Sequence, residues 1–492
     1  MDSQISAWGR SNRSEKQETH HQHWFWFYLL LGAAVILFTF NLGHLPIQAS
    51  YEGKIAQTAK EIWQGSASSL DWNAPDRFEL QHFPLMELIT ALAYQLGGVT
   101  PLMTRLPGTL LAALSVPLVY SLGREIFTIP RKAIFASFIY LTLLPVLSYS
   151  RLATLDGAAL FLIVALMWCV ARSRRDLRYC LGAGLSLGTL CLLKGLGGVV
   201  WLVITLVFLA WDTPRLLSCG YFWGGIFLGC APMLGWYGAQ WHYHLQSLSF
   251  SQALDQFFVT LGRNLGQDQR NRSSWFYLLE IWRYGLPWLV FLPAGLLFAW
   301  RRHNWSWAKL VLVWLGIYLG AGLLIPSNSW SLLPIYPVAA LAIASYFSDG
   351  IQLPQNQAYP RFWTSLLILL TVMAIGGTAY VGILKIGGNL LFLTMAALAL
   401  TMLTATVLVS RRDWQFLLIL FWGSYVTLFL FLATPYWGLD LRNINNFKPI
   451  EIKQTMQIIQ ITQTGFPQLS SQAVILIMRN QLVLGGSSSS SP

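Results

Sequence analysis

Charged residues are scarce in this chain of 492 residues. Lys, Arg, Asp and Glu together make up 11% of it, and hydrophobic residues 55%, whereas a soluble globular protein averages about 25% charge. This balance excludes a cytosolic enzyme, a disordered chain and a secreted disulfide scaffold. Cysteine is scarce too: the chain has five, and none has the close Cys/His spacing that a zinc site needs. The composition is typical of a protein solvated mainly by lipid.

Long apolar runs take up about half of the chain, and a run of about 18 or more apolar residues spans a bilayer as a helix. We therefore predict an all-α integral membrane protein with about thirteen transmembrane helices. The first run is too long and too aromatic for a cleaved signal peptide, so we expect it to stay as a helix. The runs lie at residues 24–43, 106–123, 133–149, 153–171, 179–193, 196–211, 221–240, 286–300, 308–326, 332–347, 363–384, 389–409 and 415–433.

Positive charge indicates the topology. The net charge of +12 would suggest nucleic acid in a soluble protein, but here Lys and Arg lie between apolar runs, so we expect no nucleic acid partner. Short loops rich in Lys and Arg stay in the cytoplasm, and four such loops fall on one side of the count, at 124–132, 172–178, 301–302 and 411–412. The segment 1–23 is then cytoplasmic, and a short tail, 434–492, lies outside.

Two long segments of the transmembrane domain 24–433 share the outer side, residues 44–105 and 241–285. In the first, residues 54–64 and 85–97 show helical apolar spacing but are too short to span, so we predict interfacial helices on the membrane surface. The second departs from the positive-inside rule, which indicates an anionic ligand. Its arginines are Arg263, Arg270, Arg272 and Arg283.

Carboxylates at membrane depth are candidates for function because they are expensive to place there. Asp156 lies five residues into a predicted span, at the end of Arg151-Leu152-Ala153-Thr154-Leu155-Asp156. We expect it to face a cavity near the outer surface; the alternative is a structural pair with Arg151 or with another helix. Glu52 is expected on the same side, where it begins an interfacial helix. The helix dipole alone would favour a carboxylate there.

Three cations on the outer side are candidates for binding an anion. Lys194 precedes a Gly-rich turn at 195–198 that could meet a phosphate, although a lone Lys also snorkels. His82 begins the second interfacial helix and Arg263 lies in the middle of the second outer loop; each alone would equally suit a solvated polar residue. A His-x-His pair at 242–244 has no third ligand nearby, so no metal site is predicted.

The order of these motifs resembles the polytopic GT-C glycosyltransferases, specifically the family of protein O-mannosyltransferases and the lipid A aminoarabinose transferase. The segment 51–56 is similar to the family's Asp-Glu-Gly-(Arg/Lys)-x-Ala, with Tyr51 in place of Asp, and His82 falls where Lys is usual. Residues 104–107 are similar to Ala-Arg-Leu-Pro, and 192–195 to Leu-Thr-Lys-Gly. The family's Arg-Leu-Ala-Thr-Leu-Asp is unchanged at 151–156. The resemblance covers residues 40 to 345.

This resemblance implies a sugar donor linked to a polyprenyl phosphate. The sugar would move, with inversion, to a hydroxyl or phosphate of a lipid, glycan or protein acceptor, at a site facing outside a bacterial inner or plasma membrane. No cofactor is required, and a divalent metal is left open. The implied site has Glu52 and Asp156 as catalytic carboxylates, Lys194, Arg263 and His82 at the donor phosphate, and Arg151 and Tyr51 in support.

Two other classes stay open. A transporter or flippase of lipid-linked sugar would also have many spans and a basic outer cavity, but it needs no carboxylate at an acceptor site. A member of the same family that binds the lipid-linked sugar without transferring it is the third possibility, because Tyr51 replaces the usual Asp.

Overall fold

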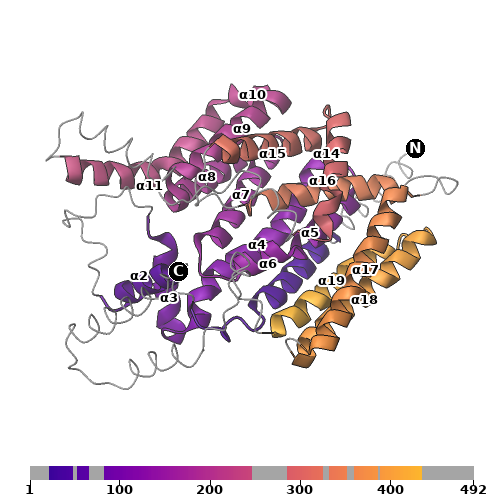
Figure 1. Cartoon of the computed structure of the whole chain (residues 1–492). Coiled ribbons are helices and arrows are strands. Elements are labelled where there is room, and N and C mark those ends of the chain that lie inside the picture. The colour runs from indigo at the N-terminus through magenta and orange to yellow at the C-terminus, as the bar shows by residue number, and fades with distance from the viewer. Residues whose placement is uncertain are drawn as a thin grey trace, which may run out of the picture. The chain divides into compact units, whose positions relative to one another are not determined.

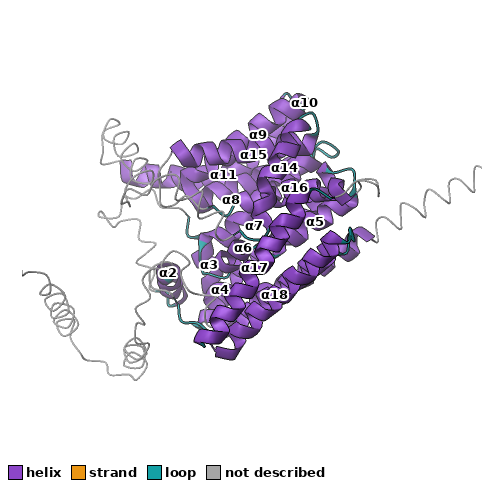
Figure 2. Cartoon of the chain, turned by 45° about the vertical axis from the view of Figure 1, so that its right-hand side comes forward, coloured by secondary structure: helices purple, strands orange, loops and turns teal. Residues whose placement is uncertain are grey.

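The structure is a computed structural model, and it describes residues 22–47, 52–65, 83–245, 285–324, 332–351, 359–385 and 388–434. The chain divides into two compact units, residues 1–438 and 439–492, and every described residue belongs to the first. The regular secondary structure of these described segments is entirely helical (Figure 2). This confirms the all-α prediction.

All thirteen apolar runs fall on helices. These are the first helix (Gln22–Thr39), α4 (Pro101–Ile126), α5 (Pro130–Leu141) with α6 (Leu144–Ser150), α7 (Leu155–Arg172), α8 (Tyr179–Lys194), α9 (Val199–Asp212), α11 (Gly220–Leu245), η4 (Trp288–Phe291) with α14 (Leu292–Arg301), α15 (Ser306–Leu324), α16 (Ile335–Ile351), α17 (Arg361–Leu384), α18 (Gly388–Ser410) and α19 (Phe416–Ala433).

Not every helix that carries an apolar run is long enough to cross a membrane. Within the described residues, six helices are long and apolar enough to cross a membrane, or seven if α5 and α6, which meet at 58°, form one broken span. Helices such as α8, with 16 residues, fall short of the roughly 20 that a perpendicular span needs. The count of thirteen therefore stays a prediction.

Two helices of the first outer segment lie where the apolar spacing predicts them, α2 (Gly53–Trp63) and α3 (Leu85–Gly97). The two helices lie side by side (Figure 1) and pack on each other through Ala59, Ala91 and Tyr94, which form a small buried cluster. The Tyr94 hydroxyl shares a hydrogen bond of 2.8 Å with Thr104 in α4. Their apolar faces are therefore partly buried against protein, and a position on the membrane surface stays a prediction.

Glycines bring the central helices close together. A Cβ atom on Gly157 of α7 would lie 2.7 Å from the carbonyl oxygen of Gly108 in α4, so the two backbones touch. In the same way, Gly184 and Gly188 of α8 face Gly225 and Gly229 of α11, each against the other helix's backbone. Small residues four apart allow this approach, which is how helices associate in lipid.

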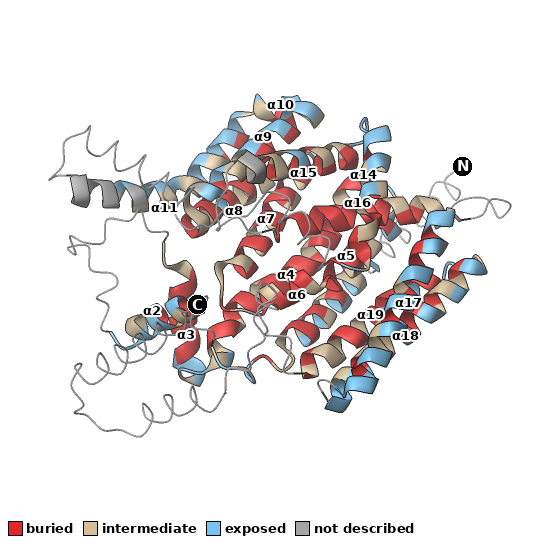
Figure 3. Ribbon diagram, in the orientation of Figure 1, coloured by how far each residue is buried: buried red, intermediate tan, exposed pale blue. Residues whose placement is uncertain are grey.

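The outer helices differ from the central ones in what they expose. Most of α4 and α7 is buried, whereas most residues of α17 and α18 are exposed or only partly buried (Figure 3). The exposed side chains on α17 and α18 are largely apolar, as expected where lipid is the solvent. They include Ile368, Leu369, Val372, Met373, Leu390, Leu393 and Leu400.

Three of the four basic loops meet at one end of the bundle, as the topology prediction requires. Ion pairs connect them: Arg172 with Glu125 at 2.6 Å, Arg174 with Asp212 at 2.9 Å, and Asp349 with Lys132 at 2.7 Å and with Arg302 at 2.9 Å. The fourth loop contacts the segment after α16, where the Tyr359 hydroxyl donates to the Arg412 carbonyl oxygen. We call these four loops the basic end.

Candidate active site

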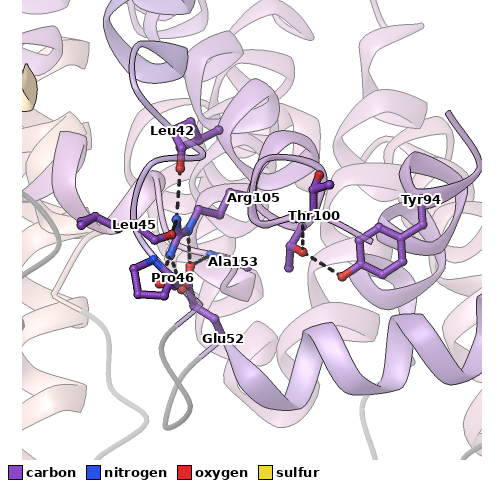
Figure 4. A network of polar contacts seen from close by, with 9 residues as sticks. Leu42, Leu45, Pro46, Glu52, Tyr94, Thr100, Arg105 and Ala153 are labelled. Atoms are coloured by element: carbon purple, nitrogen blue, oxygen red, sulfur yellow. Dashed lines mark hydrogen bonds and ion pairs between the residues drawn. The ribbon is translucent and has the colours of Figure 1, made fainter. Parts of the chain in front are cut away.

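Glu52 is fully buried at the start of α2, with none of its surface exposed. Its Oε1 atom accepts hydrogen bonds from Nε of Arg105 at 2.7 Å and from the backbone N–H of Ala153 at 2.8 Å. Its Oε2 atom accepts from Nη2 of Arg105 at 2.6 Å. The carboxylate therefore joins three parts of the chain: the first outer segment, α4, and the residues just before α7 (Figure 4).

Arg105 lies in the second turn of α4 and is itself only 1% exposed. Besides Glu52 it binds three backbone carbonyl oxygens that follow the first helix: Nη1 donates to Leu42 at 3.0 Å and Leu45 at 2.8 Å, and Nη2 to Pro46 at 2.9 Å. A guanidinium has five N–H donors, and here five acceptors meet them. We call Arg105, Glu52 and these backbone partners the Arg105 clamp. The sequence-based hypothesis gives Arg105 no role, because Arg105 lies just before the apolar run 106–123 and only charges within the runs count as charges at membrane depth.

Arg151 is the second buried arginine near Glu52. Its Nη1 donates to the carbonyl oxygens of Leu37 at 3.2 Å and Phe38 at 3.0 Å, both in the first helix. Burial, and then the nearby charge of Arg105, lower the pKa of Arg151 to about 9, so it stays charged at neutral pH. Arg151 thus fastens the residues before α7 to the first helix, and its supporting role in the reaction stays a prediction.

Asp156 and Lys194 form an ion pair of 2.6 Å. The prediction that Asp156 lies five residues into a span is wrong, because α7 begins at Leu155 and Asp156 stands in its first turn. Lys194 is the last residue of α8, and Gly195 after it adopts a positive φ of 59°. A carboxylate at a helix start and a cation at a helix end both suit the helix dipoles.

This pair differs from Glu52 in exposure. The Asp156 and Lys194 side chains are 23% and 28% exposed, so a ligand can reach them. The structural alternative, a pair with another helix, is present in the geometry, since Lys194 belongs to α8; the partial exposure is what leaves the pair open to chemistry. Tyr318 of α15 lies within electrostatic reach of Asp156, a neighbour that the sequence did not indicate.

The segment before α3 is tied to the end of α8. The backbone N–H of Phe83 donates to the Leu192 carbonyl oxygen at 3.0 Å, and the Phe83 ring lies edge-on to Trp236 of α11, with centroids 4.7 Å apart. The first outer segment therefore reaches the residues next to Lys194. Three residues of the predicted site, Tyr51, His82 and Arg263, lie outside the described residues, and their roles stay predictions.

Comparison with known proteins shows which fold this chain has. The sequence model of the dolichyl-phosphate-mannose-protein mannosyltransferase family matches residues 81–236, a stretch that holds Arg105, Asp156 and Lys194. The crystal structure of ArnT from Cupriavidus metallidurans bound to undecaprenyl phosphate aligns with a TM-score of 0.64, at 18% identity, over 83% of this chain and 76% of that one. The chain has a GT-C glycosyltransferase fold.

Curated relatives agree with the GT-C assignment. An undecaprenyl phosphate-alpha-4-amino-4-deoxy-L-arabinose arabinosyl transferase of Pseudomonas fluorescens is 25% identical over 57% of this chain and 53% of its own length, and a second is 24% identical over 71% and 64%. The chain thus spans between about half and two thirds of the relatives it matches. With its apolar helices, the GT-C fold makes this an integral multi-pass membrane protein.

Proposed function

We propose that this chain is a membrane glycosyltransferase that moves a sugar from a polyprenyl-phosphate donor to a hydroxyl or phosphate acceptor. The observation that carries the proposal is the Asp156–Lys194 pair, a carboxylate and a cation 2.6 Å apart and partly exposed at the ends of two apolar helices. A lipid donor keeps its tail in the bilayer, and its phosphate lies at the membrane surface, where the apolar helices end. The names of the relatives and the undecaprenyl phosphate bound to ArnT support this donor class.

In this proposal the two polar groups of the pair divide the reaction between them. The acceptor oxygen attacks the anomeric carbon, and the bond from that carbon to the phosphate oxygen breaks with its electrons going to the phosphate. Asp156 takes the acceptor proton as general base, and Lys194 stabilises the departing phosphate with a charge-assisted hydrogen bond. A single displacement inverts the anomeric carbon.

Glu52 and Asp156 then have different tasks, set by their surroundings as in other enzymes with two carboxylates. Glu52 accepts three hydrogen bonds, two of them from Arg105, and has no exposed surface. Asp156 has one cation and an exposed face. We assign the base to Asp156 and a supporting role to Glu52, whereas the sequence-based hypothesis has Glu52 as the base or as the residue that orients the acceptor, with Asp156 sharing or assisting that role.

The ion pair also links binding of the donor phosphate to activation of the base. As long as Lys194 holds Asp156 at 2.6 Å, each neutralises the other. A donor phosphate brings a second negative charge to Lys194, which weakens its hold on Asp156 and frees the carboxylate to accept a proton. The base is therefore released in the presence of donor.

The side of the membrane is part of the same proposal. The positive-inside rule assigns the basic end to the cytoplasm, and Asp156 lies at the other end of α7 from Arg172. The site then faces outside, where His82 and Arg263 of the two outer segments complete the phosphate site. The acceptor is a lipid, glycan or protein of that compartment.

One experiment separates this function from its alternatives. Purified protein is incubated with undecaprenyl-phosphate sugars and candidate acceptors, and release of free undecaprenyl phosphate is measured, with Asp156→Asn as the control. A glycosyltransferase releases the lipid phosphate only with acceptor present. In proteoliposomes a flippase moves the intact donor across the bilayer without releasing it, and a protein that only binds does neither.

A further inference from the structure

The Arg105 clamp holds the residues that lead into α7. Between α6 and α7 the chain has only four residues, Arg151 to Thr154, and both ends of this connection are fastened. Arg151 binds carbonyl oxygens of the first helix, and the N–H of Ala153 binds Glu52. Asp156 follows Ala153 by three residues. We infer that Arg105 is a positioning residue, which sets the place of Asp156 through Glu52 and the Ala153 N–H.

One face of α4 is connected to the start of α7 at two places, directly at Gly108 and, from Arg105, through Glu52 to Ala153. Gly108 lies three residues after Arg105, and residues three apart lie on one face of a helix. The closeness of Gly108 to Gly157 leaves no space for a Cβ atom. Because α7 is pressed against α4 at Gly157 and tied to it through the Arg105 clamp at Ala153, its first turn has no freedom to slide. Asp156 lies between these two contacts.

Arginine is required here by its shape as well as its charge. The five acceptors around Arg105 come from two sources, the backbone carbonyls of 42–46 and the carboxylate of Glu52, and they are met by three different nitrogen atoms. Lysine offers three donors from one atom and cannot bind a carboxylate through two parallel bonds. We therefore expect Arg105→Lys to keep the buried charge balanced while it loosens Glu52 and, with it, the Ala153 N–H.

Hydrogen–deuterium exchange tests the first part of this inference without any activity. In detergent-solubilised Arg105→Lys, peptides covering 151–157 should exchange at least about tenfold faster than in wild type, the factor that corresponds to loss of one ordinary hydrogen bond. Glu52→Gln is the second variant, in case Arg105→Lys does not give a monodisperse protein. The matched control is Arg172→Lys, which alters an ion pair with Glu125 at the far end of the same helix and should leave 151–157 unchanged.

Turnover tests the second part, and this arm rests on the proposed function. Arg105→Lys should lower kcat by about tenfold or more, and the loss should vanish in an Asp156→Asn background, because residues that act through one another are not additive. Losses that multiply in the double variant would mean that Arg105 supports the fold alone, and would overturn the inference, as would unchanged exchange at 151–157. If wild type transfers no sugar, the proposed function fails, and exchange alone decides whether Arg105 holds the start of α7.

Discussion

The two ends of α7 carry ion pairs of opposite character. At its start, Glu52 and Arg105 are almost completely buried, and the adjoining Asp156–Lys194 pair is the one a ligand can reach. At its end, Arg172 and its neighbours form several pairs with side chains up to 64% exposed. The ends are about 24 Å apart, at 1.5 Å per residue over the 16 residues from Asp156 to Arg172.

The difference between the two ends separates charges that hold the structure together from charges that a ligand can reach. Pairs with an exposed partner contribute about 0–1 kcal/mol each, so those of Arg175 and Arg302, which are 64% and 45% exposed, can exchange partners. At the same end Lys132 and Asp212 are only 8% and 7% exposed. A buried pair is different: removal of one partner destabilises by about 3–5 kcal/mol. The start of α7 combines one such pair, which fixes geometry, with a second that is open to a ligand.

The largest difference between the two ends is expected in how readily an impermeant reagent reaches them in intact cells. With the native cysteines replaced, Gln64→Cys after α2 should react with an impermeant maleimide in intact cells, and Ser410→Cys beside the basic loop 411–412 should react only after permeabilisation, because the positive-inside rule predicts that the basic end faces the cytoplasm. Both residues are exposed, so burial does not explain protection. Labelling of Ser410→Cys in intact cells would reverse the topology.

Activity should depend on the carboxylate at one end alone. Asp156→Asn should lower turnover by about 10² or more, the range for loss of a general base, with thermal stability close to wild type because the pair is partly solvated. Asp349→Asn is the matched control, since Asp349 is 21% exposed and also pairs with a lysine, at 2.7 Å; its turnover should match wild type. Equal turnover in both variants would remove Asp156 from the site.

Affinity for the donor phosphate should depend on Lys194 and not on Lys309. Lys194→Met should weaken binding of undecaprenyl phosphate by roughly 10- to 150-fold, since a hydrogen bond to a charged group contributes about 1.5–3 kcal/mol. Lys309→Met, which loses a pair with Asp212 at 3.5 Å, should bind as wild type does. The uncharged polyprenol serves as ligand control. Wild type that binds polyprenol equally well has no phosphate site.

The sequence predicts the positions of the helices better than the partners of the charges. All thirteen apolar runs fall on helices in the described residues, because an apolar run reports the local solvent of a helix, and the basic loops indicate a shared end because the charge rule is also local. The partner of Glu52 is Arg105, 53 positions away, and no spacing rule connects them. Asp156 was placed too deep because the chain between α6 and α7 is irregular, which an apolar run does not reveal.

The resemblance to a known family identifies a motif that hydrophobic spacing alone does not reveal. Residues 151–156 match that family without change, and the structure explains why these six act together: Arg151 fastens the segment, Ala153 binds Glu52, and Asp156 faces Lys194. Neither the hydrophobic pattern nor the charge pattern distinguishes a residue that positions another from one that reacts. That distinction comes from exposure, which depends on the tertiary structure.

The smallest effect is expected at the basic end. Arg302→Gln should change stability by no more than about 1 kcal/mol, because Arg302 is 45% exposed and Asp349 keeps Lys132 at 2.7 Å. Thermal unfolding followed in detergent at low salt and at 1 M NaCl checks this: any difference from wild type should disappear at high salt, where the Debye length is about 3 Å. A loss near the roughly 3–5 kcal/mol expected for Glu52→Ala, or one that persists at 1 M salt, would mean that the basic end is as rigid as the Arg105 clamp. The contrast between the two ends of α7 would then not hold.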